Sequence, residues 1–339
     1  MIRRPHKQKG VALIVVLLLL AMMTTLAVQM SDRLHMNFYR VESQIQNQQA
    51  YWFAQGMEAL GKVALEQGIE DSDTVNLSQA WATRDQRYPL DGGSATGNMY
   101  DRQACFNVNA LSGLAPLTDR SSQPYLVKAL QTMMEEVGVE SYDAEVVAES
   151  IWEYVDPAEA VNSSFGAGDS TYEGFRPPYL PPRDWMADIS ELRAVNGVSA
   201  EIFDKVKPLL CAIPTTTLAV NVNTLYESQA AILVGLFAPR LSLSDAQALL
   251  QERPYDGWGA VDDFLAEPQL ASLDAEVKKQ AKDFLSVTSD YFQLDTEIVV
   301  DRSRVRLVAL LKRDSEDKVT VVRRRYGGIS ERISDNQAE

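Results

Sequence analysis

Histidine is nearly absent from this chain of 339 residues, which contains only His6 and His35. The region beyond residue 35 therefore has none, which excludes Ser-His-Asp and Cys-His catalysis and histidine-ligated zinc there. No nucleophile motif is present either. We therefore expect a protein that is not an enzyme.

Basic side chains are outnumbered by acidic ones. The chain has 32 Lys and Arg against 47 Asp and Glu, which gives a formal net charge of −15. Such acidity opposes binding to nucleic acid or to an anionic membrane surface. We expect no nucleic-acid partner.

Charge is absent from one long stretch near the N-terminus. From Val11 to Val28 the only polar side chains are Thr24 and Thr25, and no charge appears before Asp32. A helix over residues 11–31 is roughly 31 Å long, about the thickness of a bilayer core. Residues 1–10 carry several cations and should stay in the cytoplasm by the positive-inside rule. We expect one membrane-spanning helix at 11–31, with the rest of the chain on the far side.

The small residue of this region comes before the apolar run, whereas a secretory signal peptide places small residues after it. Gly10 follows Lys-Gln-Lys and directly precedes Val11. The arrangement resembles a type IV prepilin leader, here residues 1–10. The resemblance implies cleavage between Gly10 and Val11 by a prepilin peptidase, and N-methylation of Val11. An uncleaved signal anchor is the alternative.

The fifth residue after the cleavage point is Val15, where pilin-like proteins usually carry Glu. In that family the Glu pairs with the N-terminal ammonium of the neighbouring subunit already in the fibre. Two opposite charges offset each other's desolvation in the membrane, and an unpaired one is expensive. A subunit with Val15 has no earlier neighbour to neutralise, so it suits the first position, at the tip. Lack of this Glu is typical of the minor pseudopilin K family of type II secretion.

A helical apolar period continues beyond the membrane segment, with steps of three, four or their multiples. The positions are Leu34, Phe38, Val41, Ile45, Trp52, Met57, Leu60 and Ala64. One continuous helix over about 12–67 is predicted, with Gly68 at its C-cap. Its second half should pack on a globular domain through this stripe, with Trp52 and Phe53 in the core.

Alternation of apolar and polar residues predicts strands further on. Residues 102–111 and 218–225 share an apolar–Asn alternation and are expected to be paired or equivalent strands of one sheet, with 91–97 as a loop. Residues 291–300, 304–313 and 318–326 predict a terminal antiparallel meander. The polar tail 329–339 is expected to be disordered.

Between the two apolar–Asn segments the pattern becomes helical, at 126–137, 144–155, 189–192 and 200–209. An all-α insertion over 119–210 therefore interrupts a pilin-like α/β domain made of 32–118 and 211–328. The predicted class is α+β: a long N-terminal transmembrane helix packed on an antiparallel sheet, with a large all-α insertion domain.

Cysteine occurs only twice, as Cys105 before the insertion and Cys211 just after it. Outside the cytoplasm the two can form a disulfide, and two buried free thiols are the alternative. A disulfide would link the two ends of the insertion covalently and limit its movement relative to the rest of the chain.

Residues 190–209 resemble a helix-hairpin-helix with Gly197 in the turn, and a looser copy spans 246–265. In some families such a turn binds a DNA phosphate, so a pseudopilin of a DNA-uptake (competence) machine is one rival function. A membrane-anchored periplasmic hydrolase using paired carboxylates or a metal is another. The missing phosphate-binding cations weigh against the first, and the missing histidines and nucleophile motifs weigh against the second. Both hairpins are better explained as packing modules.

The irregular stretch 156–182 gathers acidic side chains among glycines. Asp156, Glu159, Asp169 and Glu173 are candidate ligands for Ca²⁺, which takes six to eight oxygen ligands from flexible loops. No EF-hand spacing is present, so a solvated acidic loop is the alternative from composition alone.

Over essentially the whole chain the sequence resembles the type II secretion minor pseudopilin K family. The matching features are the leader, Val15 and the segments 152–157, 166–172, 177–179, 190–198, 210–214 and 220–224. The resemblance implies a calcium-binding loop after the 152–157 turn. Pro157, Ala158 and Gly168 stand where the family tends to have acidic residues, and Arg183 replaces a common Asn.

The same resemblance implies a function. The chain would cap the tip of the periplasmic pseudopilus with the I and J minor pseudopilins, and would start or limit fibre growth during export of folded exoproteins across the outer membrane. Minor pseudopilin H, major pseudopilin G, the secretin and the exoproteins are further expected contacts. The expected location is the inner membrane, with a single pass and a periplasmic C-terminal domain.

Overall fold

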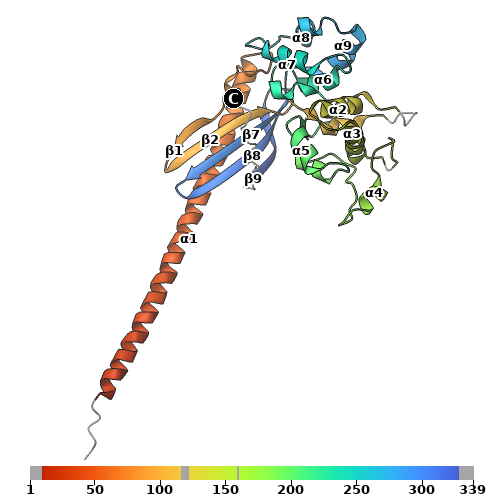
Figure 1. Ribbon diagram of the computed structural model, residues 1–339. Helices are drawn as coiled ribbons and strands as arrows, with labels where there is room; N and C mark the ends of the chain where they lie inside the picture. Colours follow the sequence, from red (N-terminus) through yellow and green to blue (C-terminus); the bar gives the residue numbers. More distant parts are fainter. Residues whose placement is uncertain (1–9, 116–121, 159, 328–339) are drawn as a thin grey trace, which may run out of the picture.

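The computed structural model describes residues 10–115, 122–158 and 160–327 (Figure 1). The leader up to residue 9, the domain boundary predicted at 118–119, Glu159 and the tail 329–339 lie outside these residues. The first element is α1 (Val11–Glu70), whose first half projects away from the rest of the molecule. Of the helices described, α1 is the one with the length and apolar composition needed to cross a membrane.

Helix α1 runs past the predicted C-cap. It continues through Gly68 and ends at Glu70, and the N–H of Asp71 donates to the carbonyl of Gln67. Gly68 stays helical because it lies beneath Trp81 in η1 (Ala80–Ala82), where an added Cβ would meet the indole ring at 3.2 Å. The glycine therefore marks close packing and not a helix end.

A five-stranded antiparallel sheet packs against the second half of α1, with strand order β1-β2-β7-β8-β9. Its strands are β1 (Gln86–Leu90), β2 (Gly93–Asp101), β7 (Tyr291–Val300), β8 (Ser303–Arg313) and β9 (Val319–Tyr326). The predicted terminal meander is confirmed. The predicted α+β class, with a long apolar helix on an antiparallel sheet, is confirmed too.

The prediction of a loop at 91–97 was wrong, because these residues form the turn between β1 and β2 and the first half of β2. The turn of the β1–β2 hairpin is Asp91-Gly92, with Gly92 at a φ of 73° that favours glycine. A side chain on Gly93 would collide with the carbonyl of Val299 on the neighbouring strand. The small residues therefore permit close strand pairing.

The face of α1 that packs on the sheet shares only Met57 with the predicted stripe. The buried positions are Gln46, Ala50, Ala54, Met57, Glu58, Leu65 and Ile69. Ala50 and Ala54 are small enough to bring the helix close to the sheet. Phe53 packs at the edge of this core, whereas Trp52 is 70% exposed, so its predicted core position was wrong. The apolar side chains that recur with a helical period in residues 34–52 are exposed, on the side of α1 that faces away from the sheet.

Residues 102–290, which lie between β2 and β7 in the sequence, form a second body with its own core, here called the insert. Its helices are η2 (Val108–Gly113), α2 (Tyr125–Glu136), α3 (Ser141–Val155), α4 (Asp169–Glu173), η3 (Ile189–Ala194), α5 (Ala200–Val206), η4 (Glu227–Gln229), α6 (Ala231–Leu236), α7 (Leu243–Gln251), α8 (Val261–Leu265), η5 (Pro268–Leu270) and α9 (Ala275–Lys282). The helical region therefore extends well beyond the predicted 119–210.

Close packing between α2 and α6 explains why the insert is larger than predicted. A side chain on Gly235 of α6 would collide with the carbonyl of Ala129 on α2, so the two backbones nearly touch. Leu233 and Leu236 join Leu130 and Met133 in one core. Residues 211–290 therefore belong with the insert and not with the sheet, which the sequence pattern alone did not reveal.

The two apolar–Asn segments do not form long strands of one sheet, and that prediction was wrong. The first contributes β3 (Phe106–Asn107), which pairs in parallel with β4 (Leu210–Cys211). The second contributes β5 (Val220–Asn221), which pairs in parallel with β6 (Leu285–Ser286). These ladders are short because the buried asparagine side chains bind loop backbone in place of a neighbouring strand.

Asn107 and Asn223 show this role. The Oδ1 of Asn107 accepts from the N–H of Ile213 at 3.1 Å, and its Nδ2 donates to the carbonyl of Thr215. Asn223 accepts from the N–H of Trp258 and donates to the carbonyl of the same residue. The alternation therefore marks buried amides that fix the course of the chain.

Candidate functional site

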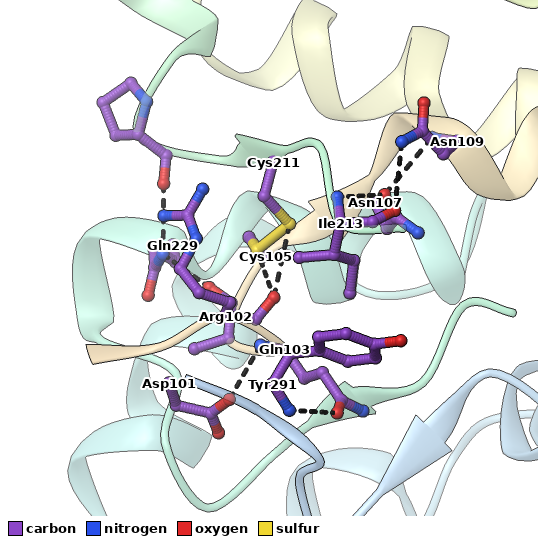
Figure 2. Close-up of a disulfide and its surroundings, with 12 residues drawn as sticks. Asp101, Arg102, Gln103, Cys105, Asn107, Asn109, Cys211, Ile213, Gln229 and Tyr291 are labelled. Carbon is purple, nitrogen blue, oxygen red and sulfur yellow. Dashed lines mark hydrogen bonds between the residues drawn. A yellow bond between two sulfur atoms is a disulfide. The ribbon is translucent and has the colours of Figure 1, made fainter. Parts of the chain in front are cut away.

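The insert joins the sheet through a polar junction that we call the neck, made of residues 101–105, 211–213, 221–224 and 289–291. Figure 2 shows the part of the neck around the disulfide. Cys105 and Cys211 form a disulfide there, with Cα atoms 5.9 Å apart. The parallel pairing of β3 with β4 brings the two cysteines together. Because the insert continues to residue 290, the bridge encloses only its first half, α2 to α5.

A buried carboxylate lies at the centre of the neck. Asp101, at the end of β2, accepts hydrogen bonds from the hydroxyls of Thr224 and Ser289, each at 2.6 Å. It also accepts from Asn221 Nδ2 and from the N–H of Gln103. Burial raises the pKa of Asp101 above its ordinary value, and these hydrogen bonds oppose the shift. One side chain thus ties the strand that enters the insert to a middle segment of the insert and to its last residues.

Two further contacts hold the insert against opposite edges of the sheet. On one side, Asp188 lies 3.1 Å from Arg325 and 4.0 Å from Arg323 of β9. Burial raises the pKa of Asp188, but hydrogen bonds from Ser190 and the two arginine charges outweigh it and leave the pKa below its ordinary value. On the other side, Arg84 donates to the Tyr226 hydroxyl and stacks over Tyr100. The insert is therefore fixed to the sheet at three places.

The outward face of α1 carries a row of exposed apolar side chains. Its large side chains beyond the membrane segment are Leu34, Phe38, Val41, Ile45 and Trp52. A contiguous apolar stripe of this kind is typical of a surface that contacts another protein or a membrane. Val15 lies in the membrane segment of the same helix and is exposed.

The start of α1 coincides with the predicted cleavage point. The helix begins at Val11, and Gly10 precedes it with a φ of 116°, a conformation that side chains rarely adopt. Cleavage itself is not visible in the structure. The left-handed backbone of Gly10 therefore places this residue outside the helix, which starts at the next residue.

The three predicted calcium ligands that the structure describes are not brought together. Asp156, at the end of α3, accepts from the side chain of Asn162 at 2.7 Å. Asp169 pairs with Arg183, Glu173 is exposed, and Glu159 lies outside the described residues. In the described ranges, no group of three or more His, Cys, Asp or Glu side chains is placed to hold a metal ion.

Glu153, one turn before Asp156, has an unsatisfied oxygen. Its Oε1 accepts from the N–H groups of Asn162 and Ser163 and from the Ser163 hydroxyl. Its Oε2 is buried and has no hydrogen-bond partner, and the residue is only 3% exposed. Burial raises the pKa of Glu153, against the hydrogen bonds from Ser163 and Asn162. A buried, half-satisfied carboxylate next to Asp156 suits a cation at this end of the loop.

Arg183 closes the other end of the loop. Its Nη2 lies 2.6 Å from Asp169 Oδ1, and its Nη1 donates to the carbonyl of Ala158. The backbone of Arg183 is left-handed, with a φ of 50°, which costs an ordinary side chain about 1–2 kcal/mol. The Asp169 end of the predicted site therefore does not fit a calcium ion, because a guanidinium already occupies it.

The first predicted hairpin packs against the insert. Gly197 has a φ of 83°, and a side chain there would meet Val147 of α3 at 3.0 Å. The nearby Arg193 places its guanidinium 4.4 Å from the centre of the Phe203 ring. Arg193, four residues before the turn glycine, thus packs on its own hairpin, which agrees with a packing module and not with a phosphate site.

Sequence reasoning missed Asp101 as a structural centre, since three of its four partners lie 120 or more residues away and leave no local signal. Asp188 did carry a signal. It begins a capping box with Glu191, whose side chain accepts from the N–H of Asp188. The role of Asp188 in binding β9 was not visible from that motif.

Together these features define a class of protein: a pilin-like subunit with one long apolar N-terminal helix packed on an antiparallel sheet and a helical insert joined to that sheet. Two family models described as type II secretion system (T2SS), protein K, match residues 104–215 and 220–288. Type II secretion system protein K of Aeromonas hydrophila is 39% identical over 95% of this chain and 98% of its own length. Type II secretion system protein K of Pectobacterium carotovorum is 33% identical over 95% of this chain and 97% of its own length.

A solved structure is similar as well. The GspK-GspI-GspJ complex from the type 2 secretion system of enterotoxigenic Escherichia coli contains a chain with 38% identity and a TM-score of 0.78. The match covers 86% of this chain and all of that one. The chain described here belongs to the type II secretion system protein K family, whose members are minor pseudopilins.

Proposed function

We propose that this chain caps the tip of the periplasmic pseudopilus in a complex with the I and J minor pseudopilins. The observation that carries the proposal is the unoccupied apolar stripe on the outward face of α1, on a fold similar to a chain of the GspK-GspI-GspJ complex. Partner helices packed along this stripe would bury it. The chain would act as a structural subunit without catalysis.

The insert supports the position at the tip. It lies at the end of the sheet away from the membrane segment of α1 (Figure 1). A further subunit stacked on that end would meet the insert before it reached α1. Placed at the tip, the chain would start the fibre with I and J, limit its growth and precede minor pseudopilin H and major pseudopilin G. The insert would then face the secretin and the exported proteins.

Processing and location complete the proposal. A prepilin peptidase would cleave between Gly10 and Val11, and Val11 would be N-methylated. The helix start at Val11 and the left-handed Gly10 support a cut at this bond. The chain would then lie in the inner membrane with a single pass, and its sheet and insert would lie in the periplasm.

Replacing Val15 with Glu tests the tip position. At the tip this carboxylate would have no ammonium to pair with, at a cost of about 2.5–3.5 kcal/mol in the membrane. We expect Val15→Glu to appear at other positions in the fibre and to reduce secretion. The measurement is the number of copies of this chain per pseudopilus, together with exoprotein release, with Val15→Leu as the matched control. Unchanged copy number and secretion in the Glu variant would remove the electrostatic reason for tip placement.

We also propose that Ca²⁺ binds at the Glu153 end of the loop, through Glu153, Asp156 and neighbouring backbone carbonyls. The buried Oε2 of Glu153 supports this placement. When bound, the ion would supply positive charge and neutralise two carboxylates at the end of α3. It would have no catalytic role.

A thermal-unfolding experiment tests the calcium proposal. At a free concentration about 100 times Kd, calcium should stabilise the folded chain by ~2.7 kcal/mol and raise Tm by a few degrees. Asp156→Ala should abolish the increase. Glu173→Ala, at the exposed candidate position, should keep it. An unchanged Tm of the wild-type chain in calcium and in EDTA would contradict the proposal.

A further inference from the structure

We infer that Arg183 is a built-in cation of the acidic loop 156–183 and does at the Asp169 end what a bound divalent ion would otherwise do. The inference goes beyond tip assembly and the proposed calcium at Glu153. It assigns a role to one residue of this chain.

The contacts of Arg183 are those of a cross-link. One guanidinium nitrogen binds the carboxylate of Asp169 at 2.6 Å, and the other donates to the carbonyl of Ala158. Residues 158 and 169 are eleven positions apart in the chain, so one side chain holds two parts of the loop together. The Arg183 side chain is only 16% exposed, which limits the competition from water.

The oxygens that Arg183 binds are of the types that calcium prefers. Calcium in protein loops takes carboxylate oxygens and backbone carbonyls. The guanidinium offers several fixed N–H donors and remains charged at any physiological pH, so it satisfies the same oxygens without a metal. It also neutralises one negative charge in a chain with a large excess of them.

The backbone supplies an independent observation. In the described ranges, four residues other than glycine have positive φ: Asp85, Arg183, Asp301 and Asp317. Three are Asp, a residue type that tolerates the left-handed region, and Arg183 is the exception. An Asn would adopt this conformation at lower cost, so the arginine side chain must contribute enough to offset the strain.

The anchoring of helix α4 in the core of the insert agrees with this role. Asp169 begins the short helix α4, and Tyr172 of that helix is fully buried in the core of the insert. The Tyr172 hydroxyl accepts from the N–H of Asn196, at the hairpin turn. Arg183 thus links the loop entrance at Ala158 to a helix already anchored in the core.

Hydrogen exchange of the full-length chain tests this role. We measure amide exchange of peptides covering 160–182, in EDTA and in millimolar CaCl₂, for the wild-type chain and for Arg183→Asn. The wild-type peptides should exchange slowly in EDTA. The variant should exchange faster by about tenfold or more in EDTA, because local opening loses its cross-link, and calcium should restore slow exchange.

Three further variants make the result specific. Arg176→Ala removes an exposed cation from the same loop and should behave as the wild-type chain does. Asp169→Asn should exchange fast in EDTA. The double variant Arg183→Asn, Asp169→Asn should stay fast in calcium, since the carboxylate that the ion would bind is gone.

Two results would overturn the inference. If Arg183→Asn exchanges as slowly as the wild-type chain in EDTA, the guanidinium does not hold the loop. If the variant exchanges fast and calcium leaves it fast, Arg183 does not stand in for a divalent cation. Neither result bears on tip assembly, and the Glu153 site is tested separately through the Asp156 variant.

Discussion

Asp101→Ala is expected to lower the free energy of unfolding by about 4 kcal/mol, because each buried donor left without a partner costs about 1–3 kcal/mol. Four donors point at this carboxylate, from Gln103, Asn221, Thr224 and Ser289. Some of them will find water after the change, so the loss should stay below the sum. The measurement is urea unfolding of the full-length chain, followed by intrinsic fluorescence.

A matched pair of variants controls this prediction. Asp101→Asn keeps one acceptor oxygen and the shape of the side chain, so its loss should be clearly smaller. Asp204→Ala removes an exposed carboxylate from α5 of the insert and should change stability by less than about 0.5 kcal/mol. A loss below about 1 kcal/mol for Asp101→Ala would mean that the neck is not organised around this residue.

Phe38→Asp and Ile45→Asp are expected to weaken assembly with I and J by about 100-fold or more, without unfolding the chain. Both side chains lie on the outward stripe of α1 and are exposed in the isolated protein, so a charge there costs little stability. In a packed helix interface each would bury a charge without a partner, at several kcal/mol. The measurement is the apparent Kd of detergent-solubilised complexes, and melting curves confirm the fold.

Gln44→Asp is the control for this second prediction. Gln44 is exposed in the same part of α1 but is polar and lies outside the apolar stripe. It should leave the Kd within about threefold of the wild-type value. Wild-type affinity in both stripe variants would show that the partners cover another surface.

The long helix and the terminal meander could be predicted because their signals are local. Residues 292–298 alternate with period two, and the strand in the structure, Tyr291–Val300, has the predicted bounds. The position of Trp52 could not be predicted in this way. A helical period identifies an apolar face but does not tell whether that face meets the same chain, lipid or a partner, and here it points away from the sheet.

The candidate site was predictable only in outline. The acidic loop was visible from composition, but the pairing of Asp169 with Arg183 depends on how the chain folds back. The extent of the insert depends on the contact between Ala129 and Gly235, more than 100 residues apart. Long-range contacts of this kind leave little trace in a single sequence, because either residue would be acceptable in many other helices.

The copy number of this chain in the assembled complex tests the central claim most directly. The full-length chain is co-expressed with the I and J minor pseudopilins, and the intact mass of the detergent-solubilised complex is measured. Tip placement predicts one species that contains one copy of each subunit, with no species that contains two copies of this chain. A complex with repeated copies of this chain, or a chain that stays alone while I and J associate, would contradict it.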